Sequence, residues 1–314
     1  MTKVRFTMSI MATFAACLLF SSVAQAQATR TWVSGVGDDA NPCSRTAPCK
    51  TFAGAISKTA AGGEINCLDP AGFGAVTITK SIMIECRHTV GGILAASVNG
   101  VIINALTTDK IILRGLDIDG AGGAGGLDGV RFLAGGSLRL EDSTINNMTN
   151  GINVALNQAA AAEVYVTRSY IRNNSNVGIF VSNAGAVVVH TKVDESSVDN
   201  NVFGIIGRNN TRATLRASTF SGNSTTGVLS EVTAGVVTSE INVDSCVITG
   251  NGTGLSSGTS ASANLGNLRV SNSTISANGT GVTAGNGQAL TFCDNKLLGN
   301  TAAGAFTGGC QTKQ

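Results

Sequence analysis

Proline is nearly absent from this sequence. The 314 residues include 3 prolines, and the stretch from Ala71 to Gln314 has none. Because proline cannot donate a backbone hydrogen bond, a long proline-free chain is typical of extensive β-sheet. The 40 glycines show no three-residue period, which excludes a collagen-like protein. Aromatic and charged residues are scarce as well, at 4% and 13%, but 43% hydrophobic residues exclude a disordered chain.

The sequence also has no excess of positive charge once its first residues are excluded from the count. Lys3 and Arg5 precede an apolar run that is followed by Ala24-Gln25-Ala26. This predicts a signal peptide over residues 1–26, with a lipoprotein signal at Cys17 or an uncleaved anchor helix as alternatives. Cleavage removes two of the 21 basic residues and none of the 19 acidic ones. We therefore expect a neutral, secreted or periplasmic chain that binds neither nucleic acid nor membrane.

Clustered metal ligands are absent from the mature sequence. Its two histidines, His88 and His190, are isolated, and no CxxC motif occurs, so a zinc site is not expected. In an oxidising compartment we expect disulfides instead. Two pairs are clear candidates, and a third would leave Cys246 unpaired: Cys43–Cys49, Cys293–Cys310 and Cys67–Cys86.

An internal repeat indicates the architecture. Eight segments can be aligned on an apolar anchor residue, and the anchors are 22 to 28 residues apart: Ile118, Ile145, Ile171, Val198, Phe220, Ile248, Ile275 and Leu297. The residue five positions before each anchor is also apolar: Leu113, Leu140, Val166, Val193, Leu215, Val243, Val270 and Phe292. This period suits one turn of a solenoid made of short strands.

Small polar residues recur at two further positions of the repeat. Serine stands two residues before the anchor in five copies: Ser143, Ser169, Ser196, Ser218 and Ser273. Asparagine follows the anchor by three residues in six: Asn174, Asn201, Asn223, Asn251, Asn278 and Asn300. Turns of a parallel β-helix stack about 4.8 Å apart, so equivalent side chains form columns. We expect aliphatic columns inside and polar ladders at the corners, where asparagine tolerates a left-handed backbone.

We therefore predict an all-β fold, a right-handed parallel β-helix of about ten rungs over residues 64–314. Residues 27–63 form an N-terminal segment with a short amphipathic helix. Phe52, Ala55 and Ile56 lie on one stripe that begins after Thr51 and ends at Gly62-Gly63. This helix is expected to cap the first rung and prevent edge-to-edge association.

The N-terminal segment and the repeat together carry a family resemblance. The stretches Arg30–Gly35, Asp39–Phe52 and Leu68-Asp69-Pro70 resemble the opening of secreted bacterial right-handed parallel β-helix proteins of the pectate-lyase-like superfamily. That resemblance implies the fold over nearly all the mature chain. It leaves the activity open, because the superfamily includes lyases, hydrolases, esterases and adhesins.

The outward positions of the first strand in each turn supply the candidate site. The possible catalytic residues are Asp194, Arg216 and Asp244, and possible ligand-binding residues beside them are Arg139, Glu141, Tyr165 and Lys192. Hydrolysis needs one protonated carboxyl group, but an arginine between two acids holds both ionised. Alternating charges are typical of an exposed ladder of salt bridges. We favour that interpretation over a ligand-binding face or a catalytic centre.

One acidic corner is a weak calcium candidate, and otherwise no cofactor is expected. Asp117, Asp119 and Asp128 flank a glycine-rich run, but the pattern occurs once and out of phase with the nonapeptide calcium repeat. A glycine-rich corner insertion is the favoured interpretation.

Aromatic faces for stacking on a sugar are few. Four phenylalanines stand on or beside apolar repeat positions and are expected in the core: Phe180, Phe203, Phe220 and Phe292. That leaves Trp32, Tyr165 and Tyr170. We therefore predict an exported, rigid and non-catalytic module that presents a surface to a glycan or an extracellular protein. The alternative is a pectate-lyase-like polysaccharide lyase or glycoside hydrolase, so enzymatic activity stays open.

Overall fold

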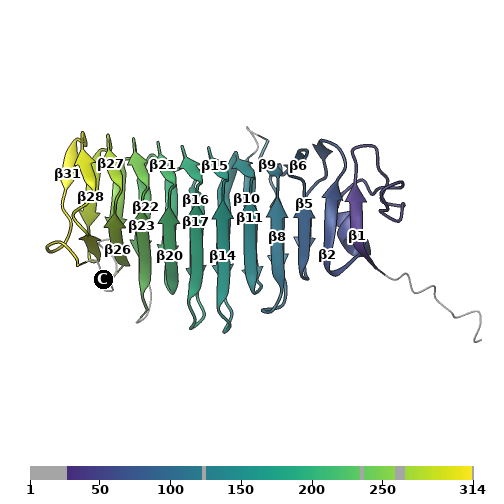
Figure 1. Ribbon diagram of the computed structural model, residues 1–314, viewed down its shortest axis with the longest axis horizontal. Helices are drawn as coiled ribbons and strands as arrows, with labels where there is room; N and C mark the ends of the chain where they lie inside the picture. Colours follow the sequence, from purple (N-terminus) through teal and green to yellow (C-terminus); the bar gives the residue numbers. More distant parts are fainter. Residues whose placement is uncertain (1–26, 122–124, 234–236, 259–265, 313–314) are drawn as a thin grey trace, which may run out of the picture.

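The protein is a long rod of stacked turns (Figure 1). The computed structural model describes residues 27–121, 125–233, 237–258 and 266–312, so the predicted signal peptide lies outside the described residues. Each turn contributes one strand to each of three sheets, and within the described parts of the chain every strand pairs in parallel with the strands one turn before and after it. The predicted parallel β-helix is confirmed.

Sheet 1, which carries the candidate site, has eleven strands in the described residues. These are β1 (Ala28–Val33), β2 (Thr59–Cys67), β5 (Ile82–Glu85), β8 (Lys110–Arg114), β11 (Ser137–Glu141), β14 (Ala162–Thr167), β17 (Val189–Asp194), β20 (Thr211–Arg216), β23 (Ser239–Asp244), β26 (Gly266–Ser271) and β29 (Gln288–Thr291). β1 lies within the stretch 27–63 and is already hydrogen-bonded to β2, so pairing in sheet 1 starts upstream of residue 64.

Sheets 2 and 3 have ten strands each within the part of the chain that is described. Sheet 2 consists of β4 (Val76–Ile78), β7 (Val101–Asn104), β10 (Gly126–Ala134), β13 (Met148–Leu156), β16 (Val177–Asn183), β19 (Phe203–Arg208), β22 (Thr226–Glu231), β25 (Thr253–Ser257), β28 (Thr280–Ala284) and β31 (Ala302–Gly304). Sheet 3 consists of β3 (Ala71–Gly72), β6 (Gly91–Leu94), β9 (Leu116–Asp119), β12 (Thr144–Asn146), β15 (Tyr170–Arg172), β18 (Ser197–Asp199), β21 (Thr219–Ser221), β24 (Val247–Thr249), β27 (Thr274–Ser276) and β30 (Lys296–Leu298).

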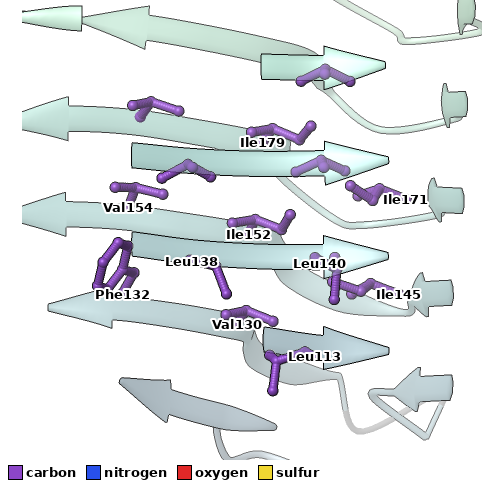
Figure 2. Packing of buried hydrophobic residues seen from close by; sticks show 14 of the residues in the cluster. Leu113, Val130, Phe132, Leu138, Leu140, Ile145, Ile152, Val154, Ile171 and Ile179 are labelled. Atoms are coloured by element: carbon purple, nitrogen blue, oxygen red, sulfur yellow. The ribbon is translucent and has the colours of Figure 1, made fainter. Parts of the chain in front are cut away.

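The interior is filled by aliphatic columns, one or two from each sheet. Figure 2 shows three of them, in which Val130, Ile152 and Ile179 stack on sheet 2, Leu113 and Leu140 on sheet 1, and Ile145 and Ile171 on sheet 3. All these side chains are fully buried. The eight predicted anchors form one continuous column on sheet 3.

The sheet 1 column departs from prediction in its last turn. Seven of its eight predicted members are paired in register, but Val270 is opposite Thr291 and not opposite Phe292. Thr291 is nearly buried, and its hydroxyl accepts a hydrogen bond from the Cys293 backbone N–H at 2.9 Å. The interior position of the final strand therefore lies one residue earlier than the repeat implies, and so does the left-handed corner residue, which is Cys293 in this turn.

The predicted asparagine ladder is present; five of its members are buried, and Asn300 at its end is half-buried. We call it the asparagine ladder (Asn174, Asn201, Asn223, Asn251, Asn278 and Asn300). In each step a side-chain Nδ2 donates to the Oδ1 of the next asparagine at 2.8–3.1 Å. That Oδ1 also accepts the backbone N–H of the previous asparagine. Each amide thus bonds the turns on both sides of it.

The left-handed backbone at this corner lies one residue earlier than we expected. The ladder asparagines themselves are regular, and the preceding residue has φ of 53–66°: Asn173, Asn200, Gly222, Gly250, Ala277 and Gly299. The glycines at the start of the next strand allow the backbones of neighbouring turns to approach closely. A Cβ added to Gly204 would lie 2.4 Å from the Gly227 carbonyl oxygen and 3.0 Å from Asn223 Nδ2.

A second ladder, the serine ladder, explains the odd cysteine. Each serine Oγ accepts the backbone N–H of the residue one turn earlier, as Ser196 Oγ does from Ser169 at 3.1 Å. Cys246 occupies a position of this ladder, and its thiol donates a hydrogen bond to the backbone carbonyl two residues earlier, that of Asp244. The hydroxyls of neighbouring serines in the ladder likewise donate to the carbonyl two residues before them. Burial raises the pKa of this thiol from 9.0 to about 11.

Both ends of sheet 1 are covered. Helix α2 (Phe52–Lys58), capped by the Thr51 hydroxyl, lies over the first turns and is shorter than predicted, because Gly62 and Gly63 belong to β2. The loop closed by Cys43–Cys49 pairs with the free edge of β1. At the other end Thr307 and Gln311 donate to β29, held there by Cys293–Cys310.

All three predicted disulfides form, including Cys67–Cys86, and Cys246 is free and buried. Three disulfides are typical of an oxidising, extracytoplasmic compartment. Within the described residues no helix is long and apolar enough to cross a membrane.

Candidate functional site

The outer face of sheet 1 carries the predicted charged residues in two columns. One contains Arg139, Tyr165, Lys192, Thr214, Asn242 and Arg269, and the other contains Arg114, Glu141, Thr167, Asp194, Arg216, Asp244 and Ser271. Alternate residues of a strand face opposite sides of the sheet, so the side chains between these columns fill the interior. We call this surface the sheet 1 face.

Asp194 forms ion pairs with two cations on this face. Its two carboxylate oxygens lie 2.9 Å from Arg216 Nε and 3.0 Å from Arg216 Nη2, and Lys192 Nζ lies 3.1 Å from Oδ2. Burial alone would raise the pKa of Asp194, but the hydrogen bonds from Arg216 and Lys192 outweigh it and hold that pKa below its usual value. Asp194 is therefore ionised at neutral pH and is not suited to act as a general acid.

Asp244 is not part of this pairing. It follows Arg216 in the column, but its Oδ1 accepts a hydrogen bond from the Ser271 hydroxyl at 2.9 Å. The structure thus brings Asp194 and Arg216 together and leaves Asp244 one turn away with a different partner.

Two turns before Asp194, the other predicted residues form a network of their own. Arg114 Nε donates to Glu141 at 2.8 Å, and Arg139 Nη1 lies 3.9 Å from the same carboxylate. The Arg139 guanidinium stacks over the Tyr165 ring, 4.4 Å from its centroid. Glu141 is thus neutralised, and one face of the tyrosine is covered by a cation.

A shallow depression of about 380 Å³ lies over β14, β17, β20 and β23. Its rim includes Tyr165, His190, Lys192, Arg212 and Glu240. His190 and Arg212 were not singled out from sequence. The sequence feature that could have identified them is a third outward position of each strand, two residues before Lys192 and Thr214, which also carries polar side chains.

Cations and carboxylates differ in exposure on the sheet 1 face. Five cationic side chains are 37–54% exposed: Arg139, Lys192, Arg212, Arg216 and Arg269. Their carboxylate partners Glu141, Asp194 and Glu240 are only 11–24% exposed. Arg114, which is 23% exposed, and the exposed Glu163 are exceptions on this face. Among the other paired groups, those that reach solvent are mainly guanidinium and ammonium groups.

The sheet 1 face is hollowed nearer the N-terminus as well. Depressions of about 390 and 590 Å³ both include Arg30 in their lining. The first is also lined by Trp32 and Lys58, the second by Lys110 and Ile112. Trp32, which we expected to be available for stacking, is half-buried there, whereas Tyr170 is exposed on sheet 3. Hollows thus recur along the sheet 1 face.

The structure separates the three aspartates of the calcium candidate. Asp117 and Asp119 lie on β9 in sheet 3, and Asp119 accepts from Asn147 Nδ2. Asp128 lies on β10 in sheet 2, where it is 3% exposed and accepts from Arg131, Asn150 and Asn153. No group of three or more metal-ligating side chains occurs among the residues with described positions.

The prediction that Phe180 and Phe203 pack in the core is wrong. Phe220 is fully buried inside, but Phe180 and Phe203 are half-buried in a separate cluster on the outer face of sheet 2. Adjacent apolar residues such as Ile179-Phe180 were the available signal, because one of two neighbours on a strand must point outward.

The comparisons with known proteins concern the fold. No family model matches the sequence, and no curated protein is similar to it. A pectate lyase, Pel9A, superposes with a TM-score of 0.54 and 14% identity, covering 90% of this chain and 78% of its own. A rhamnogalacturonan lyase matches with a TM-score of 0.44 and 10% identity, covering 81% of this chain and 82% of its own. The A-module of the Azotobacter vinelandii mannuronan C-5 epimerase AlgE4 matches at 0.45 and 12%, covering 81% of this chain and 91% of its own. The superposition on the pectate lyase shows that the chain shares the parallel β-helix fold that we expected.

Proposed function

We propose that this protein is an exported β-helix module that binds an extended anionic polysaccharide along the sheet 1 face without cleaving it. The observation that carries the proposal is the unequal exposure of charge, with cationic groups 37–54% exposed and their carboxylate partners 11–24% exposed. A polyanion that approaches this surface meets guanidinium and ammonium groups first, and these bind carboxylates well.

The shape of the sheet 1 face supports a linear ligand. Its hollows recur over β1 to β8 and over β14 to β23. Successive strands are about 4.8 Å apart, which is comparable to the length of one sugar ring, so repeated sugars meet repeated side chains. The fold is shared with a pectate lyase, which makes a uronate polymer the first ligand to test.

The side chains present argue against cleavage of that ligand. Acid catalysis needs a carboxyl group that is protonated near neutral pH, whereas two cations hold Asp194 ionised. Elimination from a uronate needs a cation that polarises the carboxylate and a base to remove a proton. Lys192 and Arg216 are both engaged by Asp194 as charged donors.

The test is calorimetric titration of the mature protein with polygalacturonate and alginate oligosaccharides at low salt. We expect binding that weakens as salt is added, since it depends on exposed charges. The double variant Lys192→Ala, Arg212→Ala should lose at least about tenfold in affinity. The control is Arg172→Ala, which removes an exposed cation from sheet 3 and should leave affinity unchanged. Binding that is insensitive to the double variant would refute the proposal, and release of unsaturated uronate would show a lyase instead.

A further inference from the structure

The outer face of sheet 2 carries an apolar cluster that the sheet 1 face lacks. We call it the sheet 2 patch: Val177, Phe180, Phe203, Ile206 and Leu229, contributed by β16, β19 and β22. The two phenylalanines are half-buried and the aliphatic side chains are 4–5% exposed. The Arg208 guanidinium covers the Phe180 ring at 5.0 Å, whereas Phe203 has no ring or cation partner among the described residues.

The patch forms the floor of a depression of about 340 Å³ with a polar rim. Asn150, Asn153 and Asn176 line one side of it. Their amides are fixed by a chain of hydrogen bonds, in which Asn176 Nδ2 donates to Asn150 Oδ1 at 3.0 Å and Asn150 Nδ2 donates to Asp128 at 2.8 Å. A rigid amide rim over an apolar floor is typical of small-molecule sites.

One acceptor in this rim has no partner. Asn153 Nδ2 donates to Asp128 at 3.0 Å, which fixes the amide orientation, since only the NH₂ end can donate to a carboxylate. Its Oδ1 is shielded from solvent and has no hydrogen-bond partner within the described part of the chain.

The charges around the depression neutralise one another. Arg208 Nε lies 2.7 Å from Glu231, and Arg131 Nη1 lies 2.9 Å from Asp128. Glu231 and Asp128 are 4% and 3% exposed. Because each of these carboxylates has its counter-ion, a neutral ligand leaves both pairs intact.

We propose that the sheet 2 patch is a second binding site, which takes a sugar of a neutral oligosaccharide. The apolar face of the ring packs on Phe203, as sugars commonly do on aromatic side chains, and hydroxyl groups bond the asparagine rim. This site is separate from the sheet 1 face and does not depend on that proposal. A protein with both sites would link a neutral glycan to an anionic one.

The experiment is titration of the mature protein with neutral hexasaccharides of glucose, xylose and mannose, monitored by calorimetry. At least one is expected to bind. Phe203→Leu, which keeps an apolar side chain but removes the ring, should weaken that binding about tenfold. Asn153→Ala should do the same, and circular dichroism checks that both variants fold. The control is Tyr165→Ala on the sheet 1 face, which should leave neutral-sugar binding unchanged.

The proposal is overturned if the wild-type protein binds none of the neutral hexasaccharides, or if Phe203→Leu and Asn153→Ala bind as the wild type does. It is also overturned if sedimentation shows a dimer that Phe203→Leu dissociates, because the patch would then be a self-association surface. Loss of uronate binding in sheet 1 variants does not affect this outcome, so the two proposals can fail separately.

Discussion

The asparagine ladder and the sheet 1 face use the same stacking for different ends. In the ladder, buried amides bond the turns on both sides, and Asn201, Asn223 and Asn251 are 0–3% exposed. On the sheet 1 face, ion pairs within a strand or between neighbouring turns leave their cations 37–54% exposed. Water can replace a lost partner at the surface but not inside. The ladder therefore holds successive turns together more strongly than the ion pairs of the charged face do.

The sharpest test of this comparison is Asn223→Ala. The substitution leaves the side-chain and backbone N–H groups of Asn201 without their acceptor and removes the side-chain donor to Asn251 Oδ1 and to the Val198 carbonyl. We expect a loss of about 3 kcal/mol in the free energy of unfolding, measured by urea denaturation. The control is Asn242→Ala on the sheet 1 face, which should change stability by less than about 0.5 kcal/mol. Equal losses in the two variants would contradict the role given to burial.

Cys246 offers a pH-dependent test within the serine ladder. The folded thiol has a pKa of about 11, raised by burial from 9.0, so above pH 9 the unfolded chain releases this proton while the folded chain retains it. Stability contributed by the neutral thiol is therefore lost as pH rises through 9 to 11. The full effect of a shift of about two units is about 2–3 kcal/mol.

The matched variant for that test is Cys246→Ser, which places the usual hydroxyl in the ladder and does not titrate in this range. The wild type should lose stability relative to the variant between pH 9 and 11, and the two should run parallel below pH 8. Thermal unfolding at each pH measures this difference. Parallel curves over the whole range would show that the thiol is not held in the neutral form.

The smallest expected effect is on the charged face. Lys192→Ala removes one of the two cations that contact Asp194 and leaves Arg216 in place. We expect a loss below about 1 kcal/mol, because Lys192 is 44% exposed and solvent screens such pairs. Urea denaturation of the single variant tests this. A loss as large as that of Asn223→Ala would mean that this face also secures the fold.

Much of the fold follows from the repeat. The anchors and the asparagine ladder are where the spacing placed them, because a solenoid brings equivalent residues of successive turns together. The register of the last turn was not predicted, because a local hydrogen bond from Cys293 to Thr291 forms there in place of the regular repeat geometry. The position of the left-handed residue was not predicted either, because residues such as Asn173 and Ala277 adopt the left-handed conformation and the ladder asparagines do not.

The site was less accessible to prediction. The columns of the sheet 1 face were read correctly, and so was the pairing of Asp194 with Arg216. The Ser271 partner of Asp244 and the stacking of Arg139 on Tyr165 depend on rotamers, which a sequence pattern does not specify. Phe180 and Phe203 were misplaced, because an apolar residue satisfies a hydrophobic pattern on either side of a strand.

By itself the sequence determined the stack of turns, which residues share a column, and which cysteines lie near one another. This was possible because the repeat fixes which residues are equivalent in successive turns, and a solenoid places equivalent residues directly above one another. The tertiary structure decided which cations reach solvent above their carboxylates, and which aromatic rings lie outside. Those properties depend on side-chain direction and on neighbours from adjacent turns, and both exist only once the turns are stacked.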